Sequence, residues 1–261
     1  MLFRPMISAF ALSRNILTKT PIYDSQKTIQ KFDNRILQRT AIISRKMTSA
    51  YGGEIGDGMK DMDKINYLPI ETKLKDGTNV KVTTFEEKDW EIGMELMNLI
   101  IREGKSWPFT EEFENMDSYR AYFLSHSAFV VKSMEEVKDV NGNTHGVDQV
   151  LGVFYVKPNF PGRCSHICNG GFITHPNFRR NNVATIMGKS FLKLAKDLGY
   201  KSSYFNLVFK SNEASIRLWE SLGFERVAEL KNAANLKGVE GLDTAYGYQY
   251  NLEDLPDDYS I

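Results

Sequence analysis

The chain has 261 residues, of which 42% are hydrophobic and 12% aromatic, so it is long and apolar enough to bury a full core. Its 33 Lys and Arg balance its 33 Asp and Glu, and this neutrality points to neither nucleic acid nor an anionic membrane as a partner. No apolar run reaches the roughly 18 residues that a membrane span needs. These properties are typical of a soluble globular protein.

The N-terminal segment departs from the overall neutrality, because residues 1–50 carry nine Lys or Arg against two Asp or Glu. A basic, hydroxyl-rich and acid-poor start with apolar residues at about helical spacing is typical of a mitochondrial transit peptide. We therefore expect a mitochondrial protein. A disordered tail, or a start at Met47 that yields a shorter cytoplasmic form, is left open. Residues 1–65 show no sustained periodicity, which predicts a leader and linker before a folded domain at 66–261.

The first predicted elements of that domain are a strand and two helices. Residues 80–85 alternate between apolar and polar side chains, as a half-buried strand does. Asp89 is a candidate N-cap for a helix whose apolar positions recur every three and four residues. A second helical segment is predicted over residues 110–123.

Three strands are predicted next, at residues 128–131, 150–156 and 164–174. Within the last of them, Gly170-Gly171 predicts either a β-bulge or a place where a ligand closely approaches the backbone.

The strand at 164–174 also contains both cysteines of the chain. Cys164 and Cys168 flank His166, a pattern that suggests a metal site. On a strand that rises about 3.3 Å per residue, however, the two cysteines lie about 13 Å apart. That separation is too large for one tetrahedral ion or for a disulfide. We therefore predict two buried thiols and no bound metal.

The C-terminal part alternates helices with strands. We predict a helix over 181–198 ended by Gly199, a buried strand over 203–209, a helix that Asn212 caps and Gly223 ends, and strands near Arg226 and at 246–250. The order of elements predicts one α/β domain with a mixed central sheet flanked by helices.

The loop before the helix at 181–198 is a candidate phosphate site. A helix N-terminus leaves backbone N–H groups without partners and carries partial positive charge, so a loop between a strand and a helix can hold a pyrophosphate. Asn182 lies in this loop, and asparagine tolerates the left-handed backbone conformation better than other residues with a side chain. A basic loop before an ordinary core helix is the alternative interpretation.

Three parts follow one another here, namely this loop, the strand at 204–209 and Asn212-Glu213-Ala214-Ser215. The region resembles the GNAT superfamily of N-acetyltransferases, in which the same parts occur in the same order. The superfamily usually has glycine at the position of Asn182. The resemblance implies a splayed sheet that holds the pantetheine arm of acetyl-CoA, with no metal. It also implies that Asn212 lies near the reactive end as a catalytic residue, although Asn212 can instead serve only as a helix cap. The cofactor-binding residues that it implies are Arg179, Arg180, Asn181, Asn182, Val183 and Ala184.

A narrower resemblance covers most of residues 90–225. Motifs such as Cys168-Asn169 and Phe205-Asn206-Leu207-Val208-Phe209 resemble the fungal L-azetidine-2-carboxylate N-acetyltransferases, which also acetylate glutamate 5-semialdehyde or its cyclic form, pyrroline-5-carboxylate. The resemblance implies that Asn169, Asn206 and the amide of Leu207 hold the substrate carboxylate, in proline or arginine metabolism or in detoxification. Neutral amides suit this task because they bury no fixed charge in the empty site. Alternatively, Asn206 is a buried polar group that ties the strands together.

Acetyl transfer needs a neutral amine, donors for the developing oxyanion and a departing thiolate. Backbone N–H groups at residues 170–173 are the candidate oxyanion donors. No carboxylate lies within residues 164–174, so we expect a water positioned by Asn212 to take the amine proton, or deprotonation before binding. Trp219 lies where many superfamily members have a tyrosine that protonates the thiolate.

Other functions are left open by the sequence. The acidic run at 111–117 suits a polyamine acceptor, although such runs are usually the solvated face of a helix. A protein amine is a further acceptor, and a non-catalytic acyl-CoA sensor is the alternative outside enzymes. Trp107 either walls the acceptor site or packs in the core. The expected partners are acetyl-CoA and a small amino acid, and assembly into a homodimer is left open.

Overall fold

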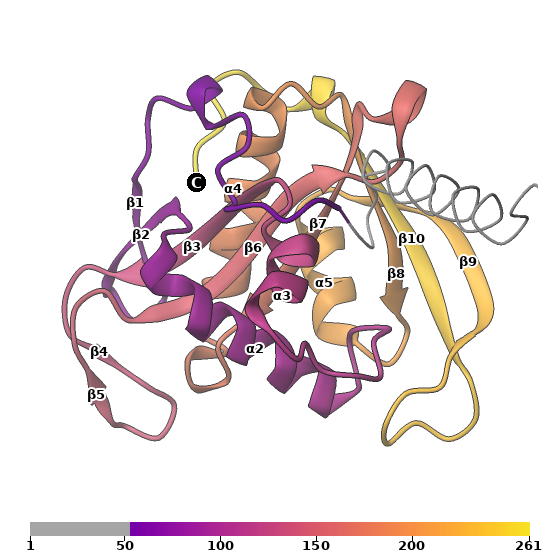
Figure 1. Cartoon of the computed structure of the whole chain (residues 1–261), viewed down its shortest axis with the longest axis horizontal. Coiled ribbons are helices and arrows are strands. Elements are labelled where there is room, and N and C mark those ends of the chain that lie inside the picture. The colour runs from indigo at the N-terminus through magenta and orange to yellow at the C-terminus, as the bar shows by residue number, and fades with distance from the viewer. Residues whose placement is uncertain (1–52) are drawn as a thin grey trace, which may run out of the picture. The chain divides into compact units, whose positions relative to one another are not determined.

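The computed structural model describes residues 53–261, so residues 1–52 of the leader and linker predicted over 1–65 lie outside the described residues. Its centre is a mixed eight-stranded sheet in the order β1-β2-β3-β6-β7-β8-β10-β9 (Figure 1). Only β7 and β8 pair in parallel, and the other neighbours in this sheet are antiparallel. The strands are β1 (Ile70–Lys73), β2 (Asn79–Thr84), β3 (Ser127–Ser133), β6 (Val150–Pro158), β7 (Ile167–Thr174), β8 (Ser202–Phe209), β9 (Glu225–Ala234) and β10 (Asp243–Asn251).

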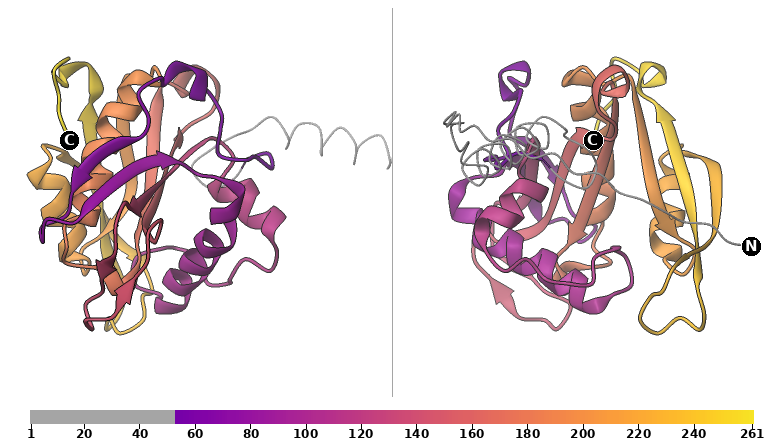
Figure 2. Two further views of the ribbon diagram at one scale, coloured as in Figure 1. Left: turned by 90° about the vertical axis from the view of Figure 1, so that its left-hand side faces the viewer. Right: turned by 45° about the vertical axis from the view of Figure 1, so that its right-hand side comes forward.

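Helices cover both faces of this sheet (Figure 2). One face is packed by α2 (Trp90–Glu103) and α3 (Met116–Phe123), whose apolar residues form a cluster with Tyr155 and Ile173 of the sheet. The other face is packed by α4 (Val183–Asp197) and α5 (Glu213–Ser221), which bury a larger cluster. The prediction of an α/β domain with a mixed central sheet flanked by helices is therefore confirmed.

The sheet opens between β7 and β8. These strands pair only at their first residues, where Ile167 faces Ser202 and Cys168 faces Ser203. Beyond that point the two strands diverge, and the backbone edges that face each other have no ladder partner (Figure 1). The fold thus contains the splayed sheet that the resemblance implied.

The Gly170-Gly171 pair is not a bulge, because Val156 and Tyr155 of β6 pair with the two glycines in continuous register. The two glycines are needed because aromatic side chains occupy the space where their Cβ atoms would lie. A Cβ on Gly171 would lie 2.5–2.7 Å from the ring and hydroxyl of Tyr155, so only glycine fits there without displacement. The bulge lies in β8, where Asn206 and Leu207 together stand opposite one residue of β10, Gly247.

Two further predictions about the elements are wrong. The second helix begins at Met116, not near residue 110, because the side chain of Asn115 accepts a hydrogen bond from the Ser118 N–H and caps the helix there. The strand that was predicted from Cys164 begins at Ile167. Cys164 lies in a short 3₁₀-helix and is exposed, whereas Cys168 is buried as predicted.

Asp89 occupies the residue before α2 but does not cap it through its side chain. Its carboxylate instead accepts a hydrogen bond from the Glu86 N–H at 3.1 Å and forms an ion pair with Lys132 of β3 at 2.7 Å. Both members of this pair are buried. The charge of the buried lysine is therefore balanced by a carboxylate from the chain itself.

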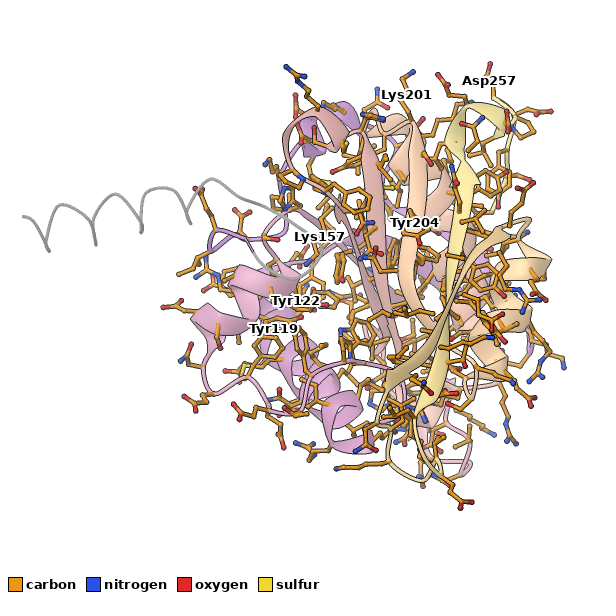
Figure 3. The ribbon with its side chains drawn as sticks, turned by 90° about the vertical axis from the view of Figure 1, so that its right-hand side faces the viewer. Tyr119, Tyr122, Lys157, Lys201, Tyr204 and Asp257 are labelled. Atoms are coloured by element: carbon orange, nitrogen blue, oxygen red, sulfur yellow. The ribbon has the colours of Figure 1, made fainter. Side chains whose placement is uncertain are left out.

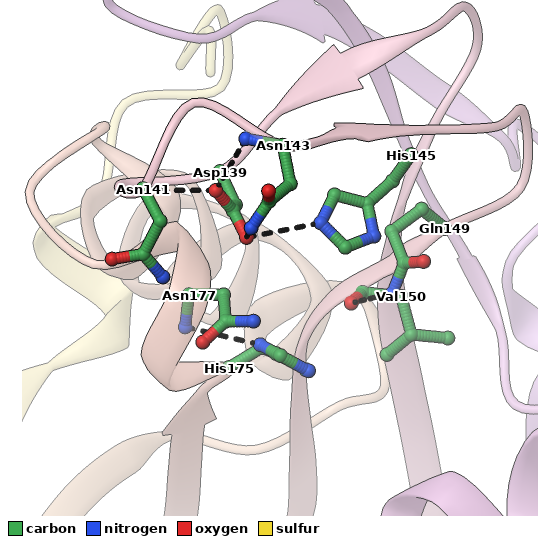
Figure 4. Close-up of polar contacts among 8 residues, drawn as sticks. All are labelled: Asp139, Asn141, Asn143, His145, Gln149, Val150, His175 and Asn177. Carbon is green, nitrogen blue, oxygen red and sulfur yellow. Dashed lines mark hydrogen bonds and ion pairs between the residues drawn. The ribbon is translucent and has the colours of Figure 1, made fainter.

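A small hairpin, β4 (Val137–Lys138) and β5 (Thr144–His145), projects from the sheet between β3 and β6. Asp139 closes it, because its carboxylate accepts hydrogen bonds from the backbones of Asn141 and Asn143 and contacts His145 Nε2 at 3.2 Å (Figure 4). These donors hold the pKa of Asp139 well below its usual value against the effect of desolvation.

Residues upstream of the predicted domain boundary also pack on the domain. Gly58 donates to the Leu124 carbonyl and accepts from the Ala128 N–H, and Ile65 belongs to the core. Within the described part of the chain, no helix combines the length and the apolar character that crossing a bilayer would need.

Candidate functional site

A cavity of about 1010 Å³ occupies the opening between β7 and β8. Its walls come from both strands, the N-termini of α4 and α5, and the segment between α2 and α3. The cavity brings together nine of the ten residues that the sequence nominated, namely Asn169, Arg179, Arg180, Asn182, Val183, Ala184, Asn206, Leu207 and Asn212. Asn181 is the exception, because its side chain turns away to bond Asp76 at 2.7 Å.

The loop before α4 has the backbone that an anion site requires. Arg180 and Asn182 are both left-handed, with φ of 65° and 69°. Asn182 directly precedes the helix, and its side chain makes no cap hydrogen bond. The first-turn N–H groups of α4 therefore have no partner from this cap, and Val183, Ala184 and Thr185 line the cavity.

The charge of the lining is strongly positive at this end. Among residues 53–261, Glu103 is the only acidic residue in the lining, and Arg179 Nη2 donates to both of its carboxylate oxygens, at 3.0 and 3.2 Å. An anionic ligand at the loop would compete with Glu103 for Arg179. The basic residues in the lining are Lys75, Lys105, Arg179, Arg180, Arg217 and Lys237. Such a surface attracts a ligand with several phosphates.

The bulge in β8 determines how Asn206 and Leu207 are presented. Phe205 and Val208, on either side of the two, both belong to the core beneath α4 and α5. The extra residue in this strand therefore leaves Asn206 and Leu207 between two core positions, and both line the cavity.

Asn206 forms a reciprocal amide pair with Asn159, which follows β6. Asn159 Nδ2 donates to Asn206 Oδ1 at 3.0 Å, and Asn206 Nδ2 donates to Asn159 Oδ1 at 2.6 Å. The pair joins β8 to the end of β6 across the opening. Each NH₂ group has two hydrogens, so Asn206 retains one donor for a ligand.

Asn169 lies on β7 directly opposite Lys157 of β6. It is 8% exposed and lines the cavity, and its side chain makes no hydrogen bond to any other residue of the described range 53–261. Asn169 is therefore a candidate ligand donor, because its amide borders the cavity and is not used within the described chain.

Asn212 caps α5, since its side-chain oxygen accepts from the Ser215 N–H at 3.2 Å. It also lines the cavity, and its NH₂ group makes no hydrogen bond within residues 53–261. The capping role is thus present, and it leaves the amide nitrogen for a second contact.

An aromatic wall, which we define as Trp107, Tyr122 and Tyr155, faces the asparagines. Trp107 Nε1 donates to the Tyr122 hydroxyl at 2.9 Å, and the two tyrosine hydroxyls lie 3.1 Å apart. All three residues line the cavity, and Trp107 also packs against the core cluster of α2 and α3, so it fits both of its predicted interpretations.

Sequence reasoning missed Tyr122, Tyr155, Lys157 and Asn159. One signal was present, because Tyr155 and Lys157 alternate on β6 and Asn159 follows the strand at the same spacing, and a lysine inside an otherwise apolar strand is unusual.

The remaining candidates from the sequence differ in their position relative to the cavity. The acidic side chains of the run at 111–117 are exposed and outside the cavity lining. Trp219 packs against the rings of Phe172 and Phe205 with centroids 4.8 and 4.7 Å away, and it forms part of the cavity floor. Within residues 53–261, no three His, Cys, Asp or Glu side chains cluster as a metal site would require.

The pattern of the Acetyltransferase (GNAT) family matches residues 97–224. N-acetyltransferase aca1 of Schizosaccharomyces pombe is 52% identical over 108 residues, which are 41% of this chain and 52% of that protein. Protein SPT10 of Saccharomyces cerevisiae is 32% identical over 109 residues, which are 42% of this chain and 17% of that protein. The match therefore spans about half the length of the first relative and about a sixth of the second.

Solved structures agree on the fold. A GCN5-related N-acetyltransferase from Kribbella flavida aligns with a TM-score of 0.56 at 20% identity, covering 66% of this chain and 97% of that one. The acetyltransferase yncA from Salmonella typhimurium, solved with acetyl-CoA, aligns with a TM-score of 0.55 at 15% identity, covering 69% and 98%. At this identity the likeness shows the fold alone. Residues 97–224 thus match the Acetyltransferase (GNAT) family, and the described chain has the fold that these solved acetyltransferases share.

Proposed function

We propose that this protein transfers the acetyl group of acetyl-CoA to the amine of a small amino or imino acid. L-Azetidine-2-carboxylate, glutamate 5-semialdehyde and pyrroline-5-carboxylate are the acceptors we favour, in proline or arginine metabolism or in detoxification. The observation that carries the proposal is the single cavity that connects the N-terminus of α4 with Asn169 and Asn206. One space thus adjoins a phosphate site at one end and amide donors at the other.

The residues present fit acetyl-CoA. The N-terminus of α4 and Arg180 suit the pyrophosphate, because backbone N–H groups and positive charge converge there. The facing edges of β7 and β8 have unpaired backbone groups beyond Cys168 and Ser203, which suit the amides of the pantetheine arm. A volume of about 1010 Å³ lies at the upper end of the range for small-molecule sites, as a long co-substrate together with an acceptor would need.

The acceptor end offers neutral donors for a carboxylate. The amide of Asn169 makes no hydrogen bond within residues 53–261, and Asn206 keeps one N–H after pairing with Asn159. The bulge exposes the backbone at Leu207 as a third donor. Three neutral donors can hold a carboxylate with charge-assisted hydrogen bonds.

The groups of the cavity that could accept the amine proton support a reaction without a carboxylate base. Glu103, the only acidic lining residue within the described residues 53–261, is bonded to Arg179 at the phosphate end. The amine proton would therefore pass to a water held by the free NH₂ of Asn212, or leave before binding. The departing thiolate has an ordinary thiol pKa of about 8.5, so it can leave without a dedicated acid.

An acceptor panel tests this proposal. The purified protein is incubated with acetyl-CoA and an amine, and free thiol is measured. We expect thiol release with L-azetidine-2-carboxylate or pyrroline-5-carboxylate, and far less with spermidine or peptide amines. Preferential release with spermidine or a peptide would assign the activity to those acceptors, and acetyl-CoA binding without thiol release from any amine would indicate a sensor.

A further inference from the structure

Two lysines are buried in neighbouring strands, and only one of them has an acidic partner among residues 53–261. Lys132 in β3 and Lys157 in β6 are 2% and 0% exposed. Lys132 has its carboxylate, Asp89, at 2.7 Å. Lys157 forms no ion pair with any acidic side chain of residues 53–261, and burial alone lowers its pKa to about 7. A buried cation without a counter-charge is costly, so its presence requires an explanation.

The ammonium of Lys157 lies among aromatic rings. Its Nζ is 4.0 Å from the ring centroid of Tyr122 and 4.3 Å from that of Tyr155, and it donates to the Tyr122 carbonyl at 2.8 Å. Lys157 and Tyr122 lie next to each other in Figure 3. The single carbonyl accepts one of three N–H groups. The remaining interactions are with ring faces, which do not neutralise the charge.

The charged groups around Lys157 do not balance it either. Burial and the charges of Lys60 and Lys157 lower the pKa of His126 to about 3, so this imidazole stays neutral. Lys60 Nζ lies 3.3 Å from His126 Nε2. Asp61 acts on His126 in the opposite direction and has the smallest influence of these groups, and its carboxylate is paired with Lys64 at 3.1 Å. Among residues 53–261, the charges that act on His126 beside Lys157 are therefore mainly positive.

Lys157 is directly behind the acceptor end of the cavity. It pairs with Asn169 across β6 and β7, and opposite residues of an antiparallel pair project from the same face. Tyr122 and Tyr155, whose rings cover the ammonium, line the cavity, but Lys157 itself does not. Its charge therefore reaches the cavity through the rings and not by contact.

We propose that Lys157 is the counter-charge for an anionic acceptor, and that it makes the site select amines that carry a carboxylate. This inference rests on the proposed function and adds the residue that supplies the missing charge. Lys157 acts as a positioning residue, because it orients the two tyrosines and sets the potential that the carboxylate meets.

The arrangement also solves the problem of a fixed charge in an empty site. With its pKa near 7, Lys157 can lose its proton while the cavity is empty. A bound carboxylate favours the charged form and raises the pKa, so binding takes up a proton at and above pH 7. Affinity for the carboxylate should accordingly fall as pH rises through the pKa of the complex. An acceptor with a neutral amide should lack this dependence.

A structural role is the alternative, since Lys157 donates to a carbonyl at the C-terminus of α3. The variant Lys157→Met separates the two. Methionine fills a similar volume, and replacing an unpaired buried charge by an apolar group should leave the melting temperature unchanged or raise it. A variant that melts much lower and loses activity toward every amine would show that the helix contact is the main role.

The kinetic test compares L-azetidine-2-carboxylate with its carboxamide in the wild type and in Lys157→Met. We expect kcat/KM for the carboxylate to fall at least about tenfold, while the value for the carboxamide changes less than about twofold. Lys157→Arg, which keeps the charge, should recover part of the preference. Equal losses for the two acceptors, or no loss for either, would overturn the inference.

A second test does not depend on turnover. The ¹³Cε signals of lysine are followed by NMR against pH in the CoA-bound protein, and Lys157 is assigned by its absence in Lys157→Met. We expect a midpoint near pH 7 that rises with L-azetidine-2-carboxylate and does not rise with the carboxamide. A midpoint that the carboxylate leaves unchanged in an active enzyme would refute the role of Lys157 alone. A midpoint that rises in a protein without transferase activity would refute the proposed function alone.

Discussion

Asn206 serves as a structural tie and is also a candidate ligand donor. Its amide pair with Asn159 joins β8 to the end of β6, and its second N–H is available to the cavity. Asn206→Ala removes both, so we expect the KM of the amino acid to rise by about tenfold to a hundredfold, the loss typical for a hydrogen bond to a charged group. The KM of acetyl-CoA should change little.

The control for this variant is Asn159→Ala, which breaks the same pair but keeps Asn206. It should lower the melting temperature, because Asn159 is buried and its partner loses a hydrogen bond. It should raise the KM of the amino acid less than Asn206→Ala does. If the two variants behave alike, or if both KM values rise together, Asn206 is a tie and not a ligand.

Asn212 also combines two roles, since it caps α5 and lines the cavity. Asn212→Ala should cost about 1 kcal/mol of stability through the lost cap and should depress kcat. Asn212→Ser keeps a capping oxygen but lacks the NH₂ group. We therefore expect Asn212→Ser to restore stability but not kcat, measured by thermal unfolding and thiol release. Recovery of kcat along with stability would leave Asn212 as a cap only.

For single residues, the sequence predicted a role in the site where the residue belongs to a recognisable motif or stands at a helix cap. Asn206 and Asn212 follow from motif resemblance, and Asn212 also from helix-cap chemistry. It did not predict the role of Lys157, because a missing counter-charge depends on which acidic residues the fold brings near. Asp89 and Lys132 are 43 positions apart in the sequence, and nothing local distinguishes Lys132 from Lys157.

Among the elements, the loop before α4 carries the most direct prediction about acetyl-CoA. Asn182 holds a left-handed conformation with φ of 69°, as its position in place of glycine led us to expect. Asn182→Gly should be tolerated, with the KM of acetyl-CoA within about twofold of the wild type. Asn182→Val should raise that KM about fivefold or more, because a β-branched side chain strains this conformation by roughly 1–2 kcal/mol.

Equilibrium binding of CoA and thiol-release kinetics both measure this effect. Lys189→Val, in the middle of α4 and outside the cavity lining, serves as a control for a β-branched side chain at an ordinary helical position. If Asn182→Val binds CoA as the wild type does, the loop is not the phosphate site.

Element types and most boundaries followed from local signals. The helix predicted over 181–198 is Val183–Asp197, and Gly199 ends it at φ of 96°. Of the two predictions for Gly170-Gly171, the bulge is wrong, and the close approach of a ligand stays a prediction for two glycines that line the cavity. Those glycines make room for Tyr155 on β6 and for aromatic rings, whereas the real bulge in β8 arises from pairing with β10, about 40 residues later.

On the scale of the whole molecule, the sequence predicted the fold class but not the order of all strands. The family resemblance implied the opening between β7 and β8, and the structure contains it. The aromatic wall of Trp107, Tyr122 and Tyr155 was not predictable, since its members come from three separate segments. Their convergence depends on how α2 and α3 pack on the sheet.

The basic segment at residues 1–50 carries a separate prediction about location. Fused to a fluorescent protein, these residues should direct it to mitochondria, because an Arg-bearing, acid-poor amphipathic segment is the usual import signal. A chain that starts at Met47 should stay in the cytoplasm. A fusion that remains cytoplasmic would favour the shorter form, and imaging with a mitochondrial marker distinguishes the two outcomes.

The central claim is that one cavity joins acetyl-CoA to a small amino acid, and product stoichiometry tests it most directly. Free thiol and N-acetylated acid are measured together in one reaction of the full chain with acetyl-CoA and L-azetidine-2-carboxylate. Our account predicts equal amounts of the two products, with saturation in both substrates and loss of activity in Asn206→Ala. Thiol without the N-acetylated acid, or neither product from a protein that binds acetyl-CoA, would contradict it.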